Sequence, residues 1–328
     1  MAKTKLSDVF VRELWTQETI LESFENTDIV QSGVFTSNSL VAKKVNDEDS
    51  ATKIQIPVVL EALYSEPDIM DDSDDNATIS KISKAAANAI VGFYSKTFGE
   101  KSIVAQLGSG IDPLDAADTL ITKFWKKDVL NRMLAQLAGA VAHNKANNNS
   151  DSVLSVDTVI SYDNVIDAIA LAGENDDFAA ILMHPKIKAA LKKADATGFV
   201  THVSETGLTL ETYNGLAVFV SNKVPFDTDT GKYTTYILRK GAFIFETANV
   251  ELPVEAFRNP LSGKGAGEET VVFRNGYLLH LNGYDFVGKN VTNSTGIPTL
   301  AELADASNWN RIVTAEGTPF VAIEAKAS

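Results

Sequence analysis

The clearest pattern in the chain is an apolar stripe that recurs at every fourth residue between positions 113 and 143. Its members are Ile121, Trp125, Val129, Met133, Leu137 and Val141, with Leu130 and Leu134 beside them. This spacing predicts an amphipathic helix, and Asp112 as N-cap and Pro113 at the first position would begin it. At about 1.5 Å per residue the helix would span about 45 Å. We expect such a long one-sided helix to lie across a sheet, with its polar face outward: Lys123, Lys126, Lys127, Asp128 and Arg132.

The part of the chain before this helix has a different pattern of polar and apolar residues. Lys53–Val58 alternates polar and apolar residues, which predicts a strand. Pro57 cannot donate a ladder hydrogen bond, so the strand should lie at a sheet edge or in an exposed hairpin. We interpret residues 36–80 as an extended, partly exposed loop or hairpin. The Ala-rich segment Thr78–Tyr94 is helical in pattern.

After position 150 the pattern mixes short helices with short strands, so the predicted fold class is α+β. The predicted helices are Tyr162–Ala172 and Pro185–Lys193. The predicted strands are Phe178–Met183, Gly207–Glu211, Leu216–Val220, Tyr233–Leu238, Val250–Phe257, Glu269–Leu281 and Pro319–Ile323.

Composition narrows the function classes. The 328 residues include no cysteine and carry a net charge of −14. The missing cysteine excludes disulfides, thiolate metal sites and cysteine nucleophiles. The negative charge disfavours tight binding to nucleic acid or anionic membranes, although it does not disfavour enclosing DNA. No secretory signal or membrane-length apolar run is found, so we expect a soluble protein made in a cytoplasm.

Candidate chemistry is sparse. The four histidines, at positions 143, 184, 202 and 280, are scattered and do not have metal-site spacing. The acidic cluster Asp68–Asp75 could hold a hard cation, but a solvated loop is the simpler interpretation. Asp227–Gly231 is typical of a turn. The glycine segments Gly108–Gly110 and Ser262–Gly267 lack the order of a phosphate-binding loop. We therefore predict no catalytic, cofactor-binding or metal-binding residues.

The order of these features resembles the major capsid proteins of tailed bacteriophages, which have the Hong Kong 97-type fold. The resemblance covers most of the chain and is carried by Gly108–Pro113, Phe124–Trp125, Val165–Ala168, Leu171–Glu174, Ala179–Pro185, Thr212–Val218, Val224–Pro225, Tyr233–Tyr236, Gly241–Phe243, Arg258, Arg274, Gly276–His280, Asn282–Gly283, Pro298–Leu303 and Asn308–Trp309. Glu174 departs from the Asp that such proteins place there. No single segment is diagnostic, so the sequential order carries the resemblance.

The resemblance implies a layout with a long spine helix, peripheral and apical domains, an N-terminal arm and an extended loop. It implies an arm at 1–35, an extended loop at 36–80, peripheral-domain segments at 81–149 (spine helix 113–143) and 241–290, an apical domain at 150–240, and a C-terminal segment at 291–328 that returns to the apical domain.

The resemblance also implies a role without an active site. The chain would be a coat protein that self-assembles into pentamers and hexamers of an icosahedral shell around phage double-stranded DNA, without sequence-specific binding. It would be assembled in the bacterial host cytoplasm and reside in the virion capsid. Candidate partners are further copies of the chain and scaffolding, portal and decoration proteins, with no membrane and no cofactor. The alternatives are an encapsulin-like nanocompartment shell and a soluble cation-dependent α+β enzyme using Asp71–Asp75.

Overall fold

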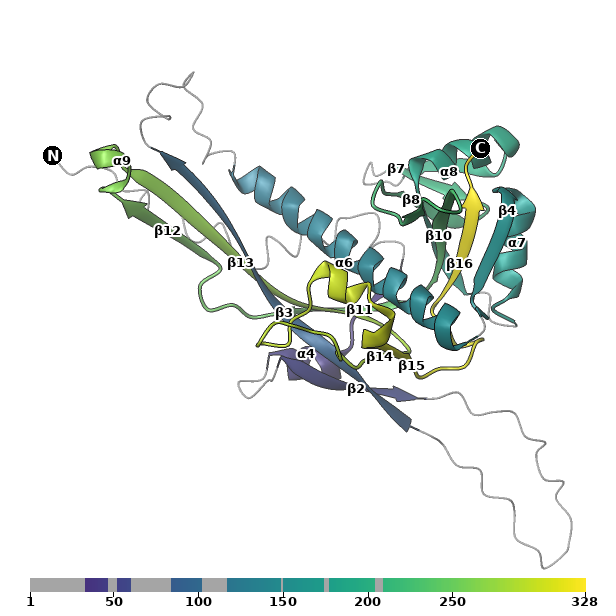
Figure 1. Ribbon diagram of the computed structural model, residues 1–328, viewed down its shortest axis with the longest axis horizontal. Coiled ribbons are helices and arrows are strands. Elements are labelled where there is room, and N and C mark those ends of the chain that lie inside the picture. Colours follow the sequence, from purple (N-terminus) through teal and green to yellow (C-terminus); the bar gives the residue numbers. More distant parts are fainter. Residues whose placement is uncertain are drawn as a thin grey trace, which may run out of the picture.

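Two large β-sheets and a long helix between them dominate the computed structural model, and β14 (Tyr284–Phe286) and β15 (Trp309–Arg311) form a further small sheet (Figure 1). It describes residues 33–46, 52–59, 84–101, 117–148, 150–173, 177–203 and 209–328. In Figure 1, long strands extend to one side of the helix and a more compact lobe lies near its C-terminal end. The predicted arm at 1–35 falls almost entirely outside the described residues.

The first sheet is built on two long antiparallel strands, β3 and β13, paired from Glu268↔Lys101 to Leu278↔Val91. Strands β11 and β12 follow one another along the other edge of β13. The strand order is β1-β11-β13-β3-β2. The bounds are β1 Phe35–Thr36, β2 Lys53–Val59, β3 Lys84–Lys101, β11 Phe243–Ala248, β12 Val254–Asn259 and β13 Glu268–Leu281.

The edge position predicted for the Pro57 strand is confirmed. Among the strands that the structure describes, β2 is the last of its sheet and pairs only with β3, with Pro57 opposite Ala86. A short helix, α4 (Ser39–Val45), precedes it and was not predicted. Its N-cap is Asn38, whose side chain accepts a hydrogen bond from the Leu40 amide.

The predicted helix at Thr78–Tyr94 is wrong, because β3 begins at Lys84 and continues as a strand to Lys101. Alanine is the strongest helix former, but intrinsic propensity is a small effect per residue, and pairing with two neighbouring strands overrides it. The alternate residues Ala87, Ala89 and Val91 are buried, as expected for one face of a strand.

Helix α6 (Ala117–Asn147) carries the predicted apolar stripe. All six stripe residues are buried, as is Leu134. The helix ends four residues after the predicted position 143, and the predicted start at Asp112–Pro113 lies outside the described residues. The polar face was only partly correct, because the Asp128 and Arg132 side chains are 15% and 12% exposed and point toward neighbouring elements.

The second sheet forms the compact lobe. Its order is β4-β16-β10-β5-β8-β7-β6, with β9 beside β10. The strands are β4 Val153–Val159, β5 Phe178–Met183, β6 Phe199–Val203, β7 Thr209–Tyr213, β8 Leu216–Val220, β9 Phe226–Asp227, β10 Lys232–Arg239 and β16 Phe320–Lys326. Helices α7 (Tyr162–Ala170) and α8 (Pro185–Ala194) share one hydrophobic core with this sheet. Strands β5 and β8 have the predicted bounds, whereas β4, β6 and β11 were missed.

The C-terminal segment packs on α6 before it reaches the second sheet. It contains β14 Tyr284–Phe286, α10 Leu300–Leu303, a 3-10 turn Ala306–Asn308 and β15 Trp309–Arg311. Gly139 makes this packing possible, because a Cβ there would lie 2.3 Å from the Leu303 carbonyl oxygen. The Trp309 indole donates a 2.7 Å hydrogen bond to that same oxygen. None of the helices in the described ranges has the length and apolar character needed to span a bilayer.

Trp125 tests the packing of α6 on the first sheet. Its side chain is buried with Ile121, Val271 and Phe273. We expect Trp125→Asp to destabilise the fold by about 4 kcal/mol or more, because it places an unpaired charge in that core. Soluble yield and thermal melting followed by circular dichroism measure the effect. Lys123→Asp on the exposed face is the matched control, and a native-like Trp125→Asp protein would contradict the packing.

Candidate functional site

The described residues offer no constellation suited to catalysis. Within them, no group of three or more His, Asp or Glu residues could hold a metal ion. His143 lies on α6, His184 caps α8, His202 is in β6 and His280 is in β13. The predicted acidic cluster Asp68–Asp75 and the segment Gly108–Gly110 lie outside the described residues. The candidate site is therefore the set of joints that fix the shape of the chain, together with its exposed apolar surface.

The first joint clamps α6 to β13. Gln136 is 3% exposed, and its amide nitrogen donates to the Leu279 carbonyl at 2.7 Å. Its amide oxygen accepts from the Leu281 backbone N–H at 3.0 Å. Both ends of the side chain are thus satisfied by one strand. A buried amide that loses such partners pays a desolvation penalty, so this pair sets the register of the helix along the strand.

A second joint connects α6 to both long strands. The Arg132 guanidinium carbon lies 3.7 Å from the centroid of the Tyr94 ring on β3. Asp128 Oδ2 accepts from Arg132 Nε at 2.9 Å and from the Tyr277 hydroxyl on β13 at 2.6 Å. Burial, followed by the nearby Asp128 charge, holds the pKa of Tyr277 well above its ordinary value. Tyr277 therefore stays a protonated hydrogen-bond donor.

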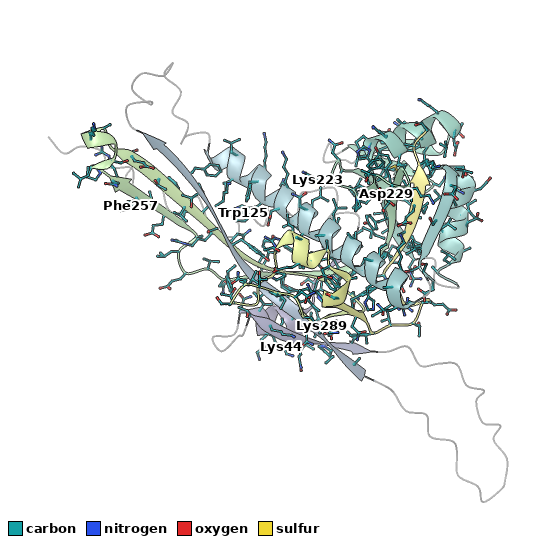
Figure 2. The ribbon with its side chains drawn as sticks, viewed as in Figure 1. Lys44, Trp125, Lys223, Asp229, Phe257 and Lys289 are labelled. Atoms are coloured by element: carbon teal, nitrogen blue, oxygen red, sulfur yellow. The ribbon has the colours of Figure 1, made fainter. Side chains whose placement is uncertain are left out.

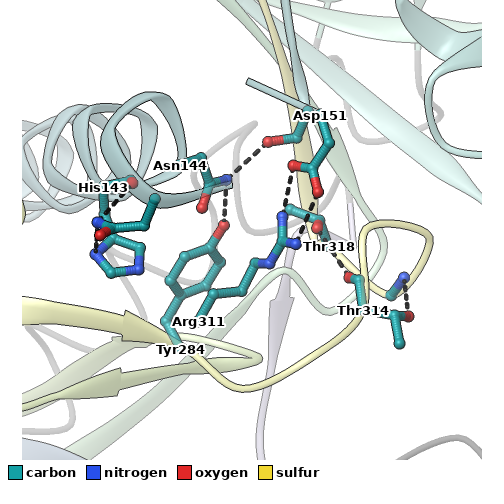
Figure 3. Close-up of polar contacts among 10 residues, drawn as sticks. His143, Asn144, Asp151, Tyr284, Arg311, Thr314 and Thr318 are labelled. Carbon is teal, nitrogen blue, oxygen red and sulfur yellow. Dashed lines mark hydrogen bonds and ion pairs between the residues drawn. The ribbon is translucent and has the colours of Figure 1, made fainter. Parts of the chain in front are cut away.

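A third joint holds the C-terminal end of α6 against the second sheet and the C-terminal segment (Figure 3). Arg311 and Asp151 form a bidentate ion pair with distances of 2.6 and 2.7 Å. The amide nitrogen of the fully buried Asn144 donates to the Ser152 hydroxyl and to the Tyr284 hydroxyl, both at 2.7 Å. Bidentate carboxylate–guanidinium pairs are geometrically specific. This joint therefore fixes the orientation of the second sheet relative to α6.

His280 lies on β13 beside the Gln136 joint. The described residues around it do not form a catalytic arrangement. Its side chain is 2% exposed, and Nε2 lies 2.8 Å from the Tyr284 carbonyl oxygen. A carbonyl only accepts, so Nε2 carries the proton. Burial lowers the pKa of His280 from 6.5 to about 4. The residue is a neutral structural donor near neutral pH.

The two remaining candidate loops are turns. Asp227 accepts hydrogen bonds from the Asp229 amide and the Thr230 hydroxyl between β9 and β10, which confirms the predicted turn. Ser262–Gly265 forms a short turn, α9, that joins β12 to β13. Its Gly263 and Lys264 have φ of 63° and 59°, a left-handed backbone typical of tight turns.

Exposed apolar side chains lie both around the first sheet and α6 and on the compact lobe formed by the second sheet. At the end of the first sheet, Phe257 is 63% exposed and Leu261 is 83% exposed (Figure 2). Further exposed apolar side chains are Leu40, Phe93, Leu120, Val159, Tyr162, Ile166, Leu171, Val200, Val220, Phe226, Leu252 and Leu300. Single exposed apolar residues are common on protein surfaces, so among these the neighbouring Phe257 and Leu261 are the strongest candidates for a contact with another chain.

The residues that form the joints were not singled out from the sequence. Gln136 was one polar residue among many in α6, and Asp151 and Arg311 are separated by 160 positions. One signal was available for Gln136: it follows the stripe residues Met133 and Val129 by three and seven positions, so it lies on the buried side of the helix.

Known proteins similar to this chain are phage capsid proteins. The major capsid protein of Bacillus phage SPP1 is 26% identical over 317 residues, which is 95% of each chain. The capsid of Ralstonia phage GP4 matches with a TM-score of 0.57 at 9% identity, covering 90% of this chain and 87% of that one. The cyanophage Pam1 capsid asymmetric unit matches with a TM-score of 0.57 at 11% identity, covering 100% and 99%. No family model matches the sequence.

The structural likenesses define the class: this chain has the α+β capsid fold of tailed phages, which confirms the Hong Kong 97-like fold predicted from the sequence. The sequence similarity runs through nearly the whole of both chains. It confirms the more specific resemblance, which is to the major capsid proteins of these phages.

The Arg311–Asp151 pair tests the third joint. The Arg311 side chain is only 9% exposed, so Arg311→Met would leave Asp151 partly buried without its partner. We expect the free energy of unfolding to fall by about 3 kcal/mol. The control is Lys145→Met, which breaks the more exposed Lys145–Glu324 pair and should cost less than about 1 kcal/mol. Equal effects in urea denaturation would contradict the role of the joint.

The pKa of His280 predicts a pH dependence. The folded state disfavours the charged imidazole. The contribution of neutral His280 to the free energy of unfolding is therefore complete above the unfolded pKa of 6.5 and is lost as pH falls toward about 4. The loss amounts to about 3 kcal/mol. Urea midpoints of the subunit between pH 7 and pH 4 measure it, with His280→Gln expected to lack this component. An unchanged pH slope in His280→Gln would contradict the assignment.

Proposed function

We propose that this protein is the major capsid protein of a tailed phage and assembles with copies of itself into an icosahedral shell. The observation that carries the proposal is its similarity to a phage major capsid protein along 95% of both chains. The joints around α6 support it, because a shell subunit must present several surfaces at fixed angles. The exposed apolar side chains of both lobes supply such surfaces.

We also propose the layout that the resemblance implies. The first sheet with α6 corresponds to the peripheral domain, at 81–149 and 241–290, and the second sheet to the apical domain, at 150–240. Residues 1–35 serve as the N-terminal arm and 36–80 as an extended loop over a neighbouring subunit. Residues 291–328 connect the two domains, because their first part packs on α6 and their last strand, β16, pairs with β4 and β10.

The finer partners follow from the shell role. We propose pentamers and hexamers of this chain that enclose double-stranded DNA without reading its sequence. Portal, scaffolding and decoration proteins are the expected further partners, and assembly takes place in the host cytoplasm. The net charge of −14 supports an enclosing role, since a wall of the same sign as DNA does not bind it tightly. We propose no enzymatic activity for the chain.

The extended loop gives a direct test of assembly. Val59 and Lys84 face each other in the β2–β3 pairing, so an Asn-Gly turn can replace residues 60–83 without disturbing either strand. We expect this variant to be soluble with an unchanged circular dichroism spectrum, but unable to form closed shells in electron microscopy. The control is a Gly/Ser linker of equal length in place of 60–83.

Shells of normal yield and stability from the shortened variant would contradict the extended-loop assignment. Particles from the wild-type chain in the same preparation keep the shell role itself under separate test. A cargo enzyme copurified inside wild-type particles would instead favour the nanocompartment alternative.

A further inference from the structure

We propose that the acidic outer face of α7 in one copy of this chain docks against the basic outer face of α8 in the next copy. This inference rests on the proposed shell function and deepens it. The α7 face of each copy would meet the α8 face of the next copy around a ring of subunits.

The apolar face of α7 is wider than the part that the core covers. Val165 and Ala168 face the core and are buried. On the outer side, Tyr162 is 41% exposed and Ile166 is 46% exposed, one helical turn apart. Tyr162 is held in place by an edge-on contact with Tyr213, with ring centroids 6.4 Å apart. An apolar edge that the core of its own chain leaves exposed can be covered by packing against another chain.

Both charged residues of α7 are acidic. Asp163 and Asp167 lie on the outer side beside Tyr162 and Ile166, and both are exposed. The helix contains no lysine or arginine. Within the described part of the chain, neither aspartate is part of an ion pair. The outer face of α7 therefore combines an apolar edge with two negative charges that have no ion-pair partner among the described residues.

Helix α8 has the opposite character. It contains four lysines and no acidic residue. Lys188 and Lys192 share Glu211 of β7. The other two, Lys186 and Lys193, are exposed and stand on either side of the exposed Ala189 at a helical spacing. The outer face of α8 is thus a small apolar position flanked by two positive charges.

The two faces match in shape as well as charge. Lys186 and Lys193 are about 10 Å apart along the helix axis, and Asp163 and Asp167 about 6 Å apart. The flexible lysine side chains can span this difference while the alanine leaves room for Ile166. The apolar contact would exclude water, which strengthens the ion pairs around it.

The positions of the helices favour a contact between unlike faces of two copies. Helix α7 packs on β4 and β16, toward one end of the second sheet. Helix α8 lies by β7 and β6, where Lys188 and Lys192 pair with Glu211 and Lys192 approaches the Phe199 ring at 5.1 Å. The N-terminal end of α7 also reaches β7, through the contact of Tyr162 with Tyr213. A contact of α7 with α7 would oppose four aspartates, whereas a contact of α7 with α8 joins opposite charges and, repeated, closes a ring.

Charge reversal tests the pairing. We expect Asp163→Lys/Asp167→Lys to lower the fraction of chain found in sedimenting particles at least tenfold, because it opposes four positive charges. Lys186→Glu/Lys193→Glu should do the same with the signs exchanged. The variant with all four substitutions restores opposite charges and should recover the wild-type fraction within about threefold. Electron microscopy of the sedimented material identifies shells.

The matched control is Asp177→Lys/Asp229→Lys, which makes the same change in net charge at two exposed positions of the same lobe. It should assemble normally. Circular dichroism checks that each variant is folded. Reversal variants that assemble like wild type, or a folded fourfold variant that does not recover, would overturn the pairing while leaving the shell function intact. A wild-type chain that forms no particles would overturn the proposed function and this inference with it.

Discussion

The clamp between α6 and β13 is the constraint on which the rest of the structure depends. A helix of 31 residues with an apolar stripe can slide along a sheet at little cost, since one turn of the stripe resembles the next. Gln136 removes that freedom, because its amide has partners at both ends only when it faces Leu279 and Leu281. With α6 fixed in register, the Arg132 and Arg311 joints hold the long strands and the second sheet at set angles.

A fixed shape of the two sheets around α6 suits the shell role that we propose. Each subunit of a closed shell meets several neighbours, and every contact must occur at a defined angle. Single contacts need not be large when many act together. The exposed apolar side chains lie in several regions of the surface rather than in one patch. The net charge of −14 fits the proposed role, since a negatively charged wall would be only weakly attracted to enclosed DNA.

Local periodicity predicted those parts of the fold in which a segment largely determines its own structure. The α6 stripe and the strand Phe178–Met183 are examples, because each buries an apolar face whose period is visible in the sequence. Strand β3 was mistaken for a helix, since its alanines carry little periodic signal and its pairing partners are distant in sequence. The joint between Asp151 and Arg311 could not be predicted, because nothing local links residues 160 positions apart. The capsid resemblance came from the order of many weak features along the sequence. The similarities to the phage SPP1 major capsid protein and to the cyanophage Pam1 capsid then confirmed it.

Cryo-electron microscopy of particles formed by the purified 328-residue chain tests most directly whether this protein is a shell subunit. We expect closed shells built from rings of five and six subunits, each showing α6 laid along β13 and the compact lobe in its present orientation. Uniform small oligomers of the 35.3 kDa chain under every assembly condition would contradict it.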